Sequence, residues 1–500
     1  MIEENEELPR LPRGWLWTNV GQIYGIVGGG TPSTKVKEYW DGDIPWITSA
    51  DIYGLKDIQP QRFVTKEGIA DSATNLVPER SIVVVTRVGL GKVALAEKPL
   101  CFSQDSQALI GNSSLVHPEY ALHYLSVAVQ IFKYKHRGTT IGGVTKKQLH
   151  ELPFPLAPFN EQVRIAAKLE ELFTRLDAGV EGLRKIRVQL KRYRQAVLKY
   201  AFEGKLTEEW RKTHKHQIQP FVVVRERGSN RTEKNNKQSS ANLADLPELP
   251  ENWTWVQIGL CSDAVSGYAF KSRDFCKDGD MPVVKIGNIG YSEFVDQGGE
   301  YLPFTFINQF REYVVESDTI LMALTRPITK NTLKVCVYPK DAKTGLLNQR
   351  VAMIKPHEMI MKGFLFVYLQ SSFFKKQVLE GMSETLQPNL SPIMLKTFFV
   401  PLPPLPEQKE ITKEIEYRFS TSGNVELVLQ HSIEQEERLR QSVLEAAFEG
   451  KLVSQDPSDE PAEKLLERIK AERTKSKGEK DTARRKKSKP RQLELSPYVE

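Results

Sequence analysis

The chain has 500 residues, of which 40% are hydrophobic and 27% charged, and it carries a formal net charge of +7. The acidic start MIEENEELPR lacks the apolar core of a signal peptide, and no stretch approaches the roughly 20 apolar residues of a membrane span, so we expect a cytoplasmic protein without membrane contact. The four cysteines are scattered without a CxxC pair, which argues for a reducing compartment and against a structural zinc site.

The first body, residues 1–151, mixes short β-rich runs with glycine and proline. The run SIVVVTRV (81–88) is rich in β-branched residues and predicts a strand, and DIPWITSADI (43–52) predicts a strand, a turn and a second strand. Residues 119–135 have helical apolar spacing without a breaker. These patterns predict a domain of mixed helix and sheet.

The segment 152–206 predicts a long helix after a proline-rich start. Its apolar residues recur at a three-four spacing, which places a narrow seam along the helix and requires a partner helix. The seam comprises Leu169, Leu172, Leu176, Leu183, Ile186, Leu190, Tyr193 and Val197, with Gly179 at the one skipped position. A helix from 160 to 203 would be about 65 Å long at 1.5 Å per residue. Alternatively, the helix packs only onto its own domain.

The second half of the chain repeats this order. Residues 207–247 are polar and are interpreted as a linker, and the body 248–397 follows. In that body the runs MPVVKIGNI (281–289), SDTILMALT (317–325) and LKVCVYP (333–339) predict strands, and residues 362–379 predict a helix.

The C-terminal part predicts a second long helix, 398–452, with a less regular seam, whose simplest partner is the first helix in antiparallel orientation. Residues 453–500 then predict a short amphipathic helix (460–473) and a disordered basic tail. Residues 470–491 hold eleven Lys or Arg against three acidic residues, and residues 211–237 hold eight against two. The rest of the chain is net acidic, so the overall charge is weak support for nucleic-acid binding.

The two halves are a tandem duplication of a whole domain and its helix. Residues 193–206, YRQAVLKYAFEGKL, match residues 439–452, LRQSVLEAAFEGKL, at ten of fourteen positions. The openers LPRGWLW (11–17) and LPENWTW (249–255) also correspond. The fold class predicted is α+β: two α/β domains joined by two long antiparallel helices with pseudo-two-fold symmetry.

No catalytic or metal-binding motif stands out. VGLGKV (88–93) lacks the first glycine and the Ser or Thr of a phosphate-binding loop, and the eight histidines include no HExxH. VGGGTPS (27–33) could cradle a phosphate or be a plain loop. We predict no catalytic residue, no metal site and no bound cofactor in this chain.

The order of the repeated phrases resembles the specificity subunit of type I restriction–modification systems. The resemblance rests on the P-x-x-W-x-W openers, the phrase GGGTPS…YWDGDIPWITSADI (28–52), the P-L-x-P-x-x-E-Q start of each long helix and the two F-E-G-K-L ends. It covers residues 1–473.

The resemblance implies a non-catalytic subunit that reads a split, asymmetric DNA site. Each body would be a target-recognition domain for one half-site, and the paired helices would be a spacer that fixes the gap. The subunit would bind double-stranded DNA and two methyltransferase subunits that use S-adenosylmethionine. It would also support restriction subunits that use ATP and Mg²⁺.

Polar and basic residues near strand ends are the candidates for DNA contact, because such side chains pair with base edges and phosphates. Those in the first body are Thr48, Ser49, Asp51, Arg87, Lys92, Thr139, Thr140 and Lys146. Those in the second body are Lys285, Asn288, Arg326, Lys330, Gln387 and Asn389. For each of them, an ordinary turn role is the alternative.

Two other function classes remain open from the residues alone. One is a helical scaffold that organises partner proteins without sequence-specific DNA binding, which the net acidity of the bodies favours. The other is an enzyme with an unrecognised site. Affinity for duplex DNA that falls steeply with salt would separate DNA binding from the scaffold.

Overall fold

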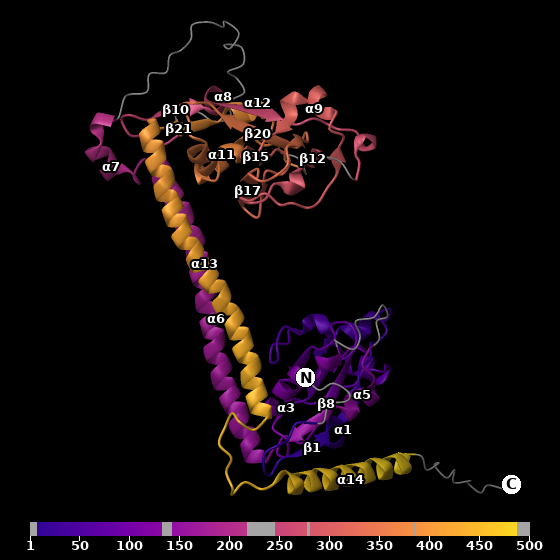
Figure 1. Cartoon of the computed structure of the whole chain (residues 1–500). Coiled ribbons are helices and arrows are strands. Elements are labelled where there is room, and N and C mark those ends of the chain that lie inside the picture. The colour runs from indigo at the N-terminus through magenta and orange to yellow at the C-terminus, as the bar shows by residue number, and fades with distance from the viewer. Residues whose placement is uncertain (1–7, 133–142, 218–245, 278–280, 384–386, 488–500) are drawn as a thin grey trace, which may run out of the picture. The chain divides into compact units, whose positions relative to one another are not determined.

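The computed structural model describes residues 8–132, 143–217, 246–277, 281–383 and 387–487, with side chains as far as Lys475. The chain divides into two compact units, residues 1–182 with 432–500 and residues 183–431 (Figure 1). Both divisions fall inside a long helix, so each unit contains one end of both long helices. Within the described residues, no helix is long and apolar enough to cross a membrane.

The first unit contains two small sheets and a two-stranded ribbon. Its strands are β1 (Leu16–Asn19), β2 (Gly25–Gly28), β3 (Ile44–Ile47), β4 (Arg62–Val64), β5 (Ile82–Val85), β6 (Val93–Leu95), β7 (Cys101–Phe102), β8 (Ser106–Ile110) and β9 (Pro153–Leu156). The order β2-β8-β5-β6 forms an antiparallel sheet, and the order β4-β3-β7 includes a parallel pair, β3 with β7. The ribbon pairs β1 with β9, which leads into the long helix.

The helices of the first unit cover these sheets and begin the long arm. They are α1 (Val20–Ile23), α2 (Lys66–Ala70), α3 (Pro118–Ala128), α5 (Lys146–Glu151), the start of α6 (Phe159–Phe202) and α14 (Ala462–Lys487). The core joins β5 and β8 to α3 and to the first turns of α6, and includes the fully buried Tyr120, Phe154 and Ile165.

The second unit repeats the arrangement with longer connections. Its strands are β10 (Thr254–Gln257), β11 (Ser262–Ser266), β12 (Met281–Val284), β13 (Tyr301–Leu302), β14 (Val314–Val315), β15 (Ile320–Ala323), β16 (Ile328–Thr329), β17 (Thr332–Leu333), β18 (Val335–Val337), β19 (Gly345–Leu347), β20 (Val351–Pro356) and β21 (Phe399–Leu402). Its helices are α7 (Glu208–Thr213), α8 (Ile258–Cys261), α9 (Phe306–Gln309), α10 (Lys362–Tyr368), α11 (Ser372–Gly381), α12 (Pro392–Thr397) and the start of α13 (Leu405–Phe448).

The sheets of the two units correspond strand by strand. The order β11-β20-β15-β18 matches β2-β8-β5-β6, and β13-β12-β19 matches β4-β3-β7 with the same parallel pair at its centre. The ribbon β10–β21 matches β1–β9 in register. The predicted fold class, two mixed domains with two long helices in tandem, is therefore confirmed.

Several predicted elements end earlier than their sequence patterns. Residues 43–52 form β3 and then a 3₁₀ turn (Ser49–Asp51) in place of a second strand, because Thr48 and Asp51 cap that turn. The helix predicted over 119–135 ends at Ala128 within the described residues. The helix predicted over 362–379 is split into α10 and α11, because the Ser371 side chain caps a new helix by accepting from Phe374 N.

The C-terminal helix is longer than predicted. We expected a short helix over 460–473 and a disordered tail beyond it, but α14 continues to Lys487. Residues 474–487 contain no proline and are rich in good helix formers, which explains the continuation. Leu465 and Ile469 are buried in the core of the first unit, and Arg473 Nη1 donates to Gly21 O at 2.5 Å.

Within each unit, the long helices lie side by side in antiparallel orientation. In the first unit, the Arg440 guanidinium of α13 lies 4.4 Å from the centroid of the Phe173 ring of α6 and pairs with Asp177. A Cβ at Gly179 would lie 2.7 Å from Glu436 Oε1, so the skipped seam position makes room for that glutamate. In the second unit, Arg194 Nε donates to Ser422 Oγ at 2.8 Å. The predicted partner of each arm is thus the other arm.

The predicted apolar seam is buried in a domain near each end of α6 and is more exposed between those ends. Leu169 is fully buried in the core of the first domain, and Val197 is buried in the core of the second. Between them, Ile186 and Tyr193 remain 43% and 42% exposed. The first arm therefore packs onto its own domain at Leu169 and onto the other domain at Val197, so the alternative that it packs only onto its own domain is wrong.

The Glu-Gln pair that opens each arm ties it to its own domain. Trp15 Nε1 donates to Glu161 Oε2, and Trp253 Nε1 donates to Glu407 Oε2, both at 2.9 Å. The adjacent glutamines act in parallel. Gln162 Oε1 accepts from His117 N at 2.8 Å, and Gln408 Oε1 accepts from Met361 N at 2.7 Å. The opener tryptophans and the Glu-Gln motif are therefore one structural device used twice.

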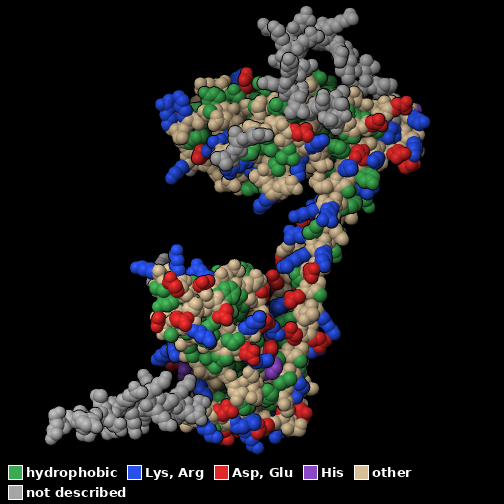
Figure 2. Space-filling model, turned by 180° about the vertical axis from the view of Figure 1, so that it is seen from behind, with side chains coloured by type: hydrophobic (Ala, Val, Ile, Leu, Met, Phe, Trp, Pro, Cys, Tyr) green, Lys and Arg blue, Asp and Glu red, His purple; other side chains and the backbone are tan. Residues whose placement is uncertain are grey.

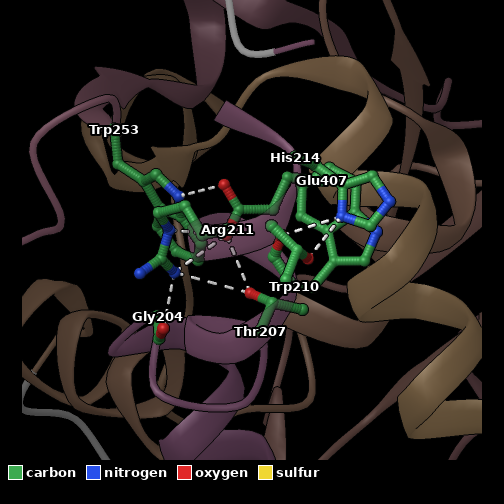
Figure 3. A network of polar contacts seen from close by, with 8 residues as sticks. Gly204, Thr207, Trp210, Arg211, His214, Trp253 and Glu407 are labelled. Carbon is green, nitrogen blue, oxygen red and sulfur yellow. Dashed lines mark hydrogen bonds and ion pairs between the residues drawn. The ribbon is translucent and has the colours of Figure 1, made fainter. Parts of the chain in front are cut away.

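The two glutamates differ in how their charge is balanced. Glu407 is fully buried and accepts from Thr207 Oγ1 at 2.8 Å and from Arg211 Nη2 at 2.8 Å, as Figure 3 shows. Arg211 Nη2 also donates to Gly204 O at 2.5 Å. The start of the segment predicted as a linker, 207–217, is thus built into the base of the second domain.

Glu161 accepts a hydrogen bond from the uncharged indole of Trp15 and, among the described residues, has no arginine bonded to it as Arg211 is to Glu407. Burial raises the pKa of the Glu161 carboxyl, while the hydrogen bond from Trp15 lowers it. Arg164, one helical turn later, pairs with Asp459 at 2.7 Å rather than with Glu161. The segment that precedes α14 is held to α6 by this pair.

The repeated F-E-G-K-L motif ends each arm inside the domain from the other half of the chain. The Phe448 ring of α13 lies 5.6 Å from Tyr120 and 5.2 Å from Tyr124 of α3, between centroids. The Phe202 ring of α6 lies 5.5 Å from Phe364 and 5.0 Å from Tyr368 of α10.

The glycine of the motif ends the helix against an opener proline. Gly204 and Gly450 have φ of +72° and +69°, and a Cβ on either would lie 2.2 Å from the Cγ of Pro250 or Pro12. Only glycine fits this position without strain. The F-E-G-K-L motif therefore occurs twice because the end of each arm packs into the domain of the other half of the chain.

Candidate nucleic-acid interface

In the first domain, the candidate residues after β3 build a capped turn. Asp51 Oδ2 accepts from Thr48 N at 2.7 Å and from Thr48 Oγ1 at 2.8 Å. Asp51 is 7% exposed, so its carboxylate is largely occupied in holding the turn. Ser49 lies in the turn itself and is half-buried. This arrangement fixes the backbone that carries Thr48 and Ser49.

Lys92 fastens the same turn from the neighbouring sheet. Its Nζ donates to Ser49 O at 2.7 Å and to Ile52 O at 2.9 Å. Gly89, at φ +84°, approaches so closely that a Cβ there would lie 3.1 Å from Ser49 Cβ. The structure therefore gives Lys92 a positioning role, with its ammonium engaged by backbone oxygens.

Arg87 begins the loop after β5 and is exposed. Its side chain covers Gly143, where a Cβ would lie 2.6 Å from Arg87 Cγ, and Val144 N donates to Thr86 O at 2.8 Å. Lys146, the first residue of α5, is exposed just beyond this contact. Thr139 and Thr140 lie outside the described residues.

The first domain thus brings three candidate segments together along one rim: 48–52, 86–92 and 143–146. Backbone groups and side chains at such a rim can donate to and accept from DNA base edges and phosphates.

The second domain has the same turn after β12. Lys285 N donates to Asn288 Oδ1 at 2.8 Å, in the place of Thr48 and Asp51, and Asn288 Nδ2 donates to Val295 O at 3.0 Å. The Lys285 ammonium pairs with Glu300 and lies 4.4 Å from the centroid of the Phe275 ring. The side chains of Lys285 and Asn288 are therefore both engaged within the domain.

A lysine that sequence reasoning missed completes the correspondence. Lys334 Nζ donates to Ile286 O at 3.3 Å, as Lys92 does to Ser49 O. Each lysine directly precedes the edge strand of its sheet, β18 or β6. That position relative to the strand is the signal that could have identified Lys334.

Two of the remaining candidates of the second domain, Arg326 and Asn389, lie on segments that meet. Leu390 N donates to Leu324 O at 2.8 Å, the equivalent of the bond from Val144 to Thr86. Arg326 N donates to Pro388 O at 2.7 Å, and Asn389 bridges to Thr325. Arg326, Lys330, Gln387 and Asn389 are all exposed. The segments around Val144 and Leu390 therefore make equivalent backbone contacts in the two domains.

Basic and acidic side chains are mixed on the face that Figure 2 shows. Figure 2 shows lysine and arginine side chains interspersed with acidic ones on the face in view, and lysines and arginines along the paired helices. The second half of α6 exposes Arg184, Lys185, Arg187, Lys191 and Arg192. Bulk charge on the face in view therefore does not mark a site.

The comparisons with known proteins decide the family. The family model described as "Type I restriction modification DNA specificity domain" matches residues 12–184 and 250–423, one copy for each half. The chain belongs to this family. It is a type I specificity subunit, which recognises DNA by sequence and is a non-catalytic component of its system.

Curated relatives are similar over nearly the whole specificity subunit. The chain is 26% identical over 493 residues to the Type I restriction enzyme EcoDI specificity subunit of Escherichia coli, covering 96% of this chain and 99% of that one. It is 25% identical over 451 residues to the MjaVIII specificity subunit of Methanocaldococcus jannaschii, covering 89% and 94%. The family assignment favours DNA recognition over the scaffold and enzyme alternatives.

Solved structures share the fold. A chain from work described as the structural basis of complex assembly and conformational transition of the type I R-M system aligns with a TM-score of 0.62 and 18% identity, covering 89% of this chain and all of that chain. The HsdS subunit from Thermoanaerobacter tengcongensis aligns with a TM-score of 0.51 and 17% identity, over 89% and 99%.

Proposed function

We propose that this specificity subunit reads a bipartite, asymmetric DNA site, with residues 1–151 and 248–397 as the two target-recognition domains. The observation that carries the proposal is the capped turn after β3 and after β12, each fastened by a lysine from the next sheet. The frame is the same, but the side chains differ: Thr48 and Ser49 in one domain, Lys285 and Ile286 in the other. One frame with two sets of side chains suits two different half-sites.

We propose that exposed side chains at these rims contact DNA. Arg87 and Lys146 in the first domain, and Arg326 and Lys330 in the second, are exposed cations suited to guanine edges or phosphates. Thr139 and Thr140 are retained from the sequence. Asp51, Lys92, Lys285 and Asn288 support the turns through the contacts described above.

The paired helices, within 152–206 and 398–452, are proposed to set the gap between the half-sites. The antiparallel pairing inside each unit and the seating of Phe202 and Phe448 in the domains support a stiff connection. Half-site spacing then follows from protein geometry, as it does for dimeric DNA-binding proteins. The start of the linker 207–247 and the C-terminal segment 453–500 contact these helices through Arg211–Glu407 and Asp459–Arg164 and are not assigned a part in setting the gap.

The partners proposed are two methyltransferase subunits and the restriction subunits of the same system, acting in the cytoplasm. The duplication offers two equivalent surfaces, which supports a pair of methyltransferase subunits. S-adenosylmethionine would be bound by those subunits, and ATP and Mg²⁺ by the restriction subunits. All four cysteines of this chain are free, which fits a reducing compartment.

Mapping of adenine methylation in the source cell, with and without this chain, tests the function. We expect a two-part motif with a fixed gap that disappears when the chain is removed. A methylated motif that persists without the chain, or a continuous motif without a gap, would contradict the proposal.

A further inference from the structure

The loop that follows the central strand differs between the two domains. In the first domain, residues 86–92 pass from β5 to β6 through Gly89 and Gly91, both at positive φ. In the second domain, the equivalent residues 324–334 form an additional two-stranded hairpin, β16 with β17. The second domain therefore has a projecting element at the rim where the candidate residues meet.

The backbone of this hairpin is held in uncommon conformations. Lys330 and Asn331, the two residues of its turn, have φ of 48° and 61°, which is typical of a tight type I′ turn. Arg326, at the base, has φ of 47°. These are three of the six non-glycine residues with positive φ in the described chain. Such conformations persist only where the surroundings enforce them, and they concentrate at functional sites.

Side chains from two other elements fix the hairpin. Lys375 Nζ of α11 donates to Asn331 O at 3.0 Å and to Asn331 Oδ1 at 2.7 Å. Tyr291 and Thr329 share a hydrogen bond of 2.7 Å between their hydroxyl oxygens. These contacts hold the turn in one conformation, which lowers the entropy cost of binding.

The tip presents hydrogen-bond donors. The Lys330 ammonium is exposed and has no hydrogen-bond or ion-pair partner among the described residues. The Asn331 oxygen is occupied by Lys375, which leaves the amide N–H groups as donors. Guanine offers two acceptors, N7 and O6, in the major groove of DNA, and that groove admits a two-stranded ribbon.

We propose that the β16–β17 hairpin enters the major groove and that Lys330 and Asn331 read a guanine in the half-site of the second domain. This inference rests on the proposed function, because it assigns a base to one of the two half-sites. In the first domain, where residues 86–92 take the place of the hairpin, other side chains would read the half-site.

Lys330→Asn is the informative variant, because asparagine tolerates the left-handed turn and lacks the ammonium. Lys340→Asn is the matched control, since Lys340 is exposed beyond the opposite end of β18. The full-length wild type and both variants would select sequences from a randomised duplex library. We expect Lys330→Asn to lose about 10- to 100-fold preference for one guanine while the other half-site stays unchanged. The control should select the wild-type motif.

Two results would overturn the inference while leaving the proposed function intact. One is an unchanged motif for Lys330→Asn. The other is an equal loss of affinity on every sequence, which indicates a phosphate contact. If the wild type selects no two-part motif, the proposed function is wrong, and the assignment of the hairpin to a guanine is wrong with it. Unchanged preferences at the remaining positions of the second domain's half-site also show that this domain of the variant is folded.

Discussion

Trp253 donates its indole N–H to Glu407 at 2.9 Å, across 154 residues of sequence. The bond joins the first residues of the second domain to the first turn of α13. Because Trp15 and Glu161 make the same bond in the other half, each domain is attached to its own arm by a buried tryptophan–glutamate pair. This attachment is where stability and the placement of the domains should be most sensitive to substitution.

Arg211→Ala should destabilise the second unit strongly. Glu407 is fully buried, and removal of its cation leaves an uncompensated buried charge, which typically costs roughly 3–5 kcal/mol. Lys212→Ala is the control, because Lys212 forms only exposed pairs and its removal should cost less than about 0.5 kcal/mol. The free energy of unfolding from denaturant titration measures both. Equal effects of the two substitutions would show that the network in Figure 3 does not stabilise the domain.

Phe202→Ala should loosen the second domain although Phe202 belongs to the first arm. Loss of a buried phenylalanine costs about 3–5 kcal/mol. Hydrogen exchange should therefore accelerate in α10, which Phe202 contacts, and not in α3. Phe448→Ala should give the reverse pattern. Leu439→Ala, at a residue 50% exposed, should change neither helix. Faster exchange in α3 of the Phe202 variant would contradict the crossed arrangement.

His123 should make the first unit less stable in acid. Its ring is buried against Phe173, with centroids 5.4 Å apart, and burial lowers the pKa of His123 to about 4. The unfolded chain takes up this proton below about 6.5, whereas the folded chain does so only near the lowered value. Stability is therefore lost as the pH falls from 6.5 to 4, by roughly 3 kcal/mol in total.

His123→Phe removes that proton uptake. The difference in the free energy of unfolding between variant and wild type should grow in favour of the variant as the pH falls through this window. A difference that stays constant from pH 7 to pH 4 would be inconsistent with a neutral buried imidazole.

Substitutions of Arg87 and Lys92 should weaken recognition of the first half-site in different ways. Arg87→Ala removes an exposed donor and should relax one position of the first half-site by about 1–3 kcal/mol. Lys92→Met frees the turn that carries Thr48 and Ser49, so preference should weaken at several positions of that half-site. Selection from a randomised duplex library distinguishes them. A loss for Lys92→Met that is uniform over all sequences would identify Lys92 as a phosphate contact instead.

The sequence alone predicts the architecture well because its signals are local or repeated. Valines 83–85 predict a strand, and the duplicated phrases around Trp15 and Trp253 predict two equivalent domains. The seating of Phe202 among α10 side chains is not predictable in this way, because the motif shows where the helix ends and not which core receives it.

The rims were predicted only in part. Arg326 and Lys330 were chosen by residue type, but their hairpin depends on left-handed residues and on Lys375, 44 residues away. Lys334 was missed because its role is a bond to a backbone oxygen, which leaves no motif. The length of α14 was underestimated because a basic run was interpreted as solvated chain.

The paired arms are proposed to set the distance between the two half-sites. Seven residues that continue the helical pattern would be inserted in both arms, between Gly182 and Leu183 and between His431 and Ser432. This lengthens each helix by about 10 Å, or at most about three base pairs. The adenine methylation motif of cells that carry the variant is the direct measurement. We expect two unchanged half-sites separated by a wider gap, and an unchanged gap would show that the arms do not set the distance.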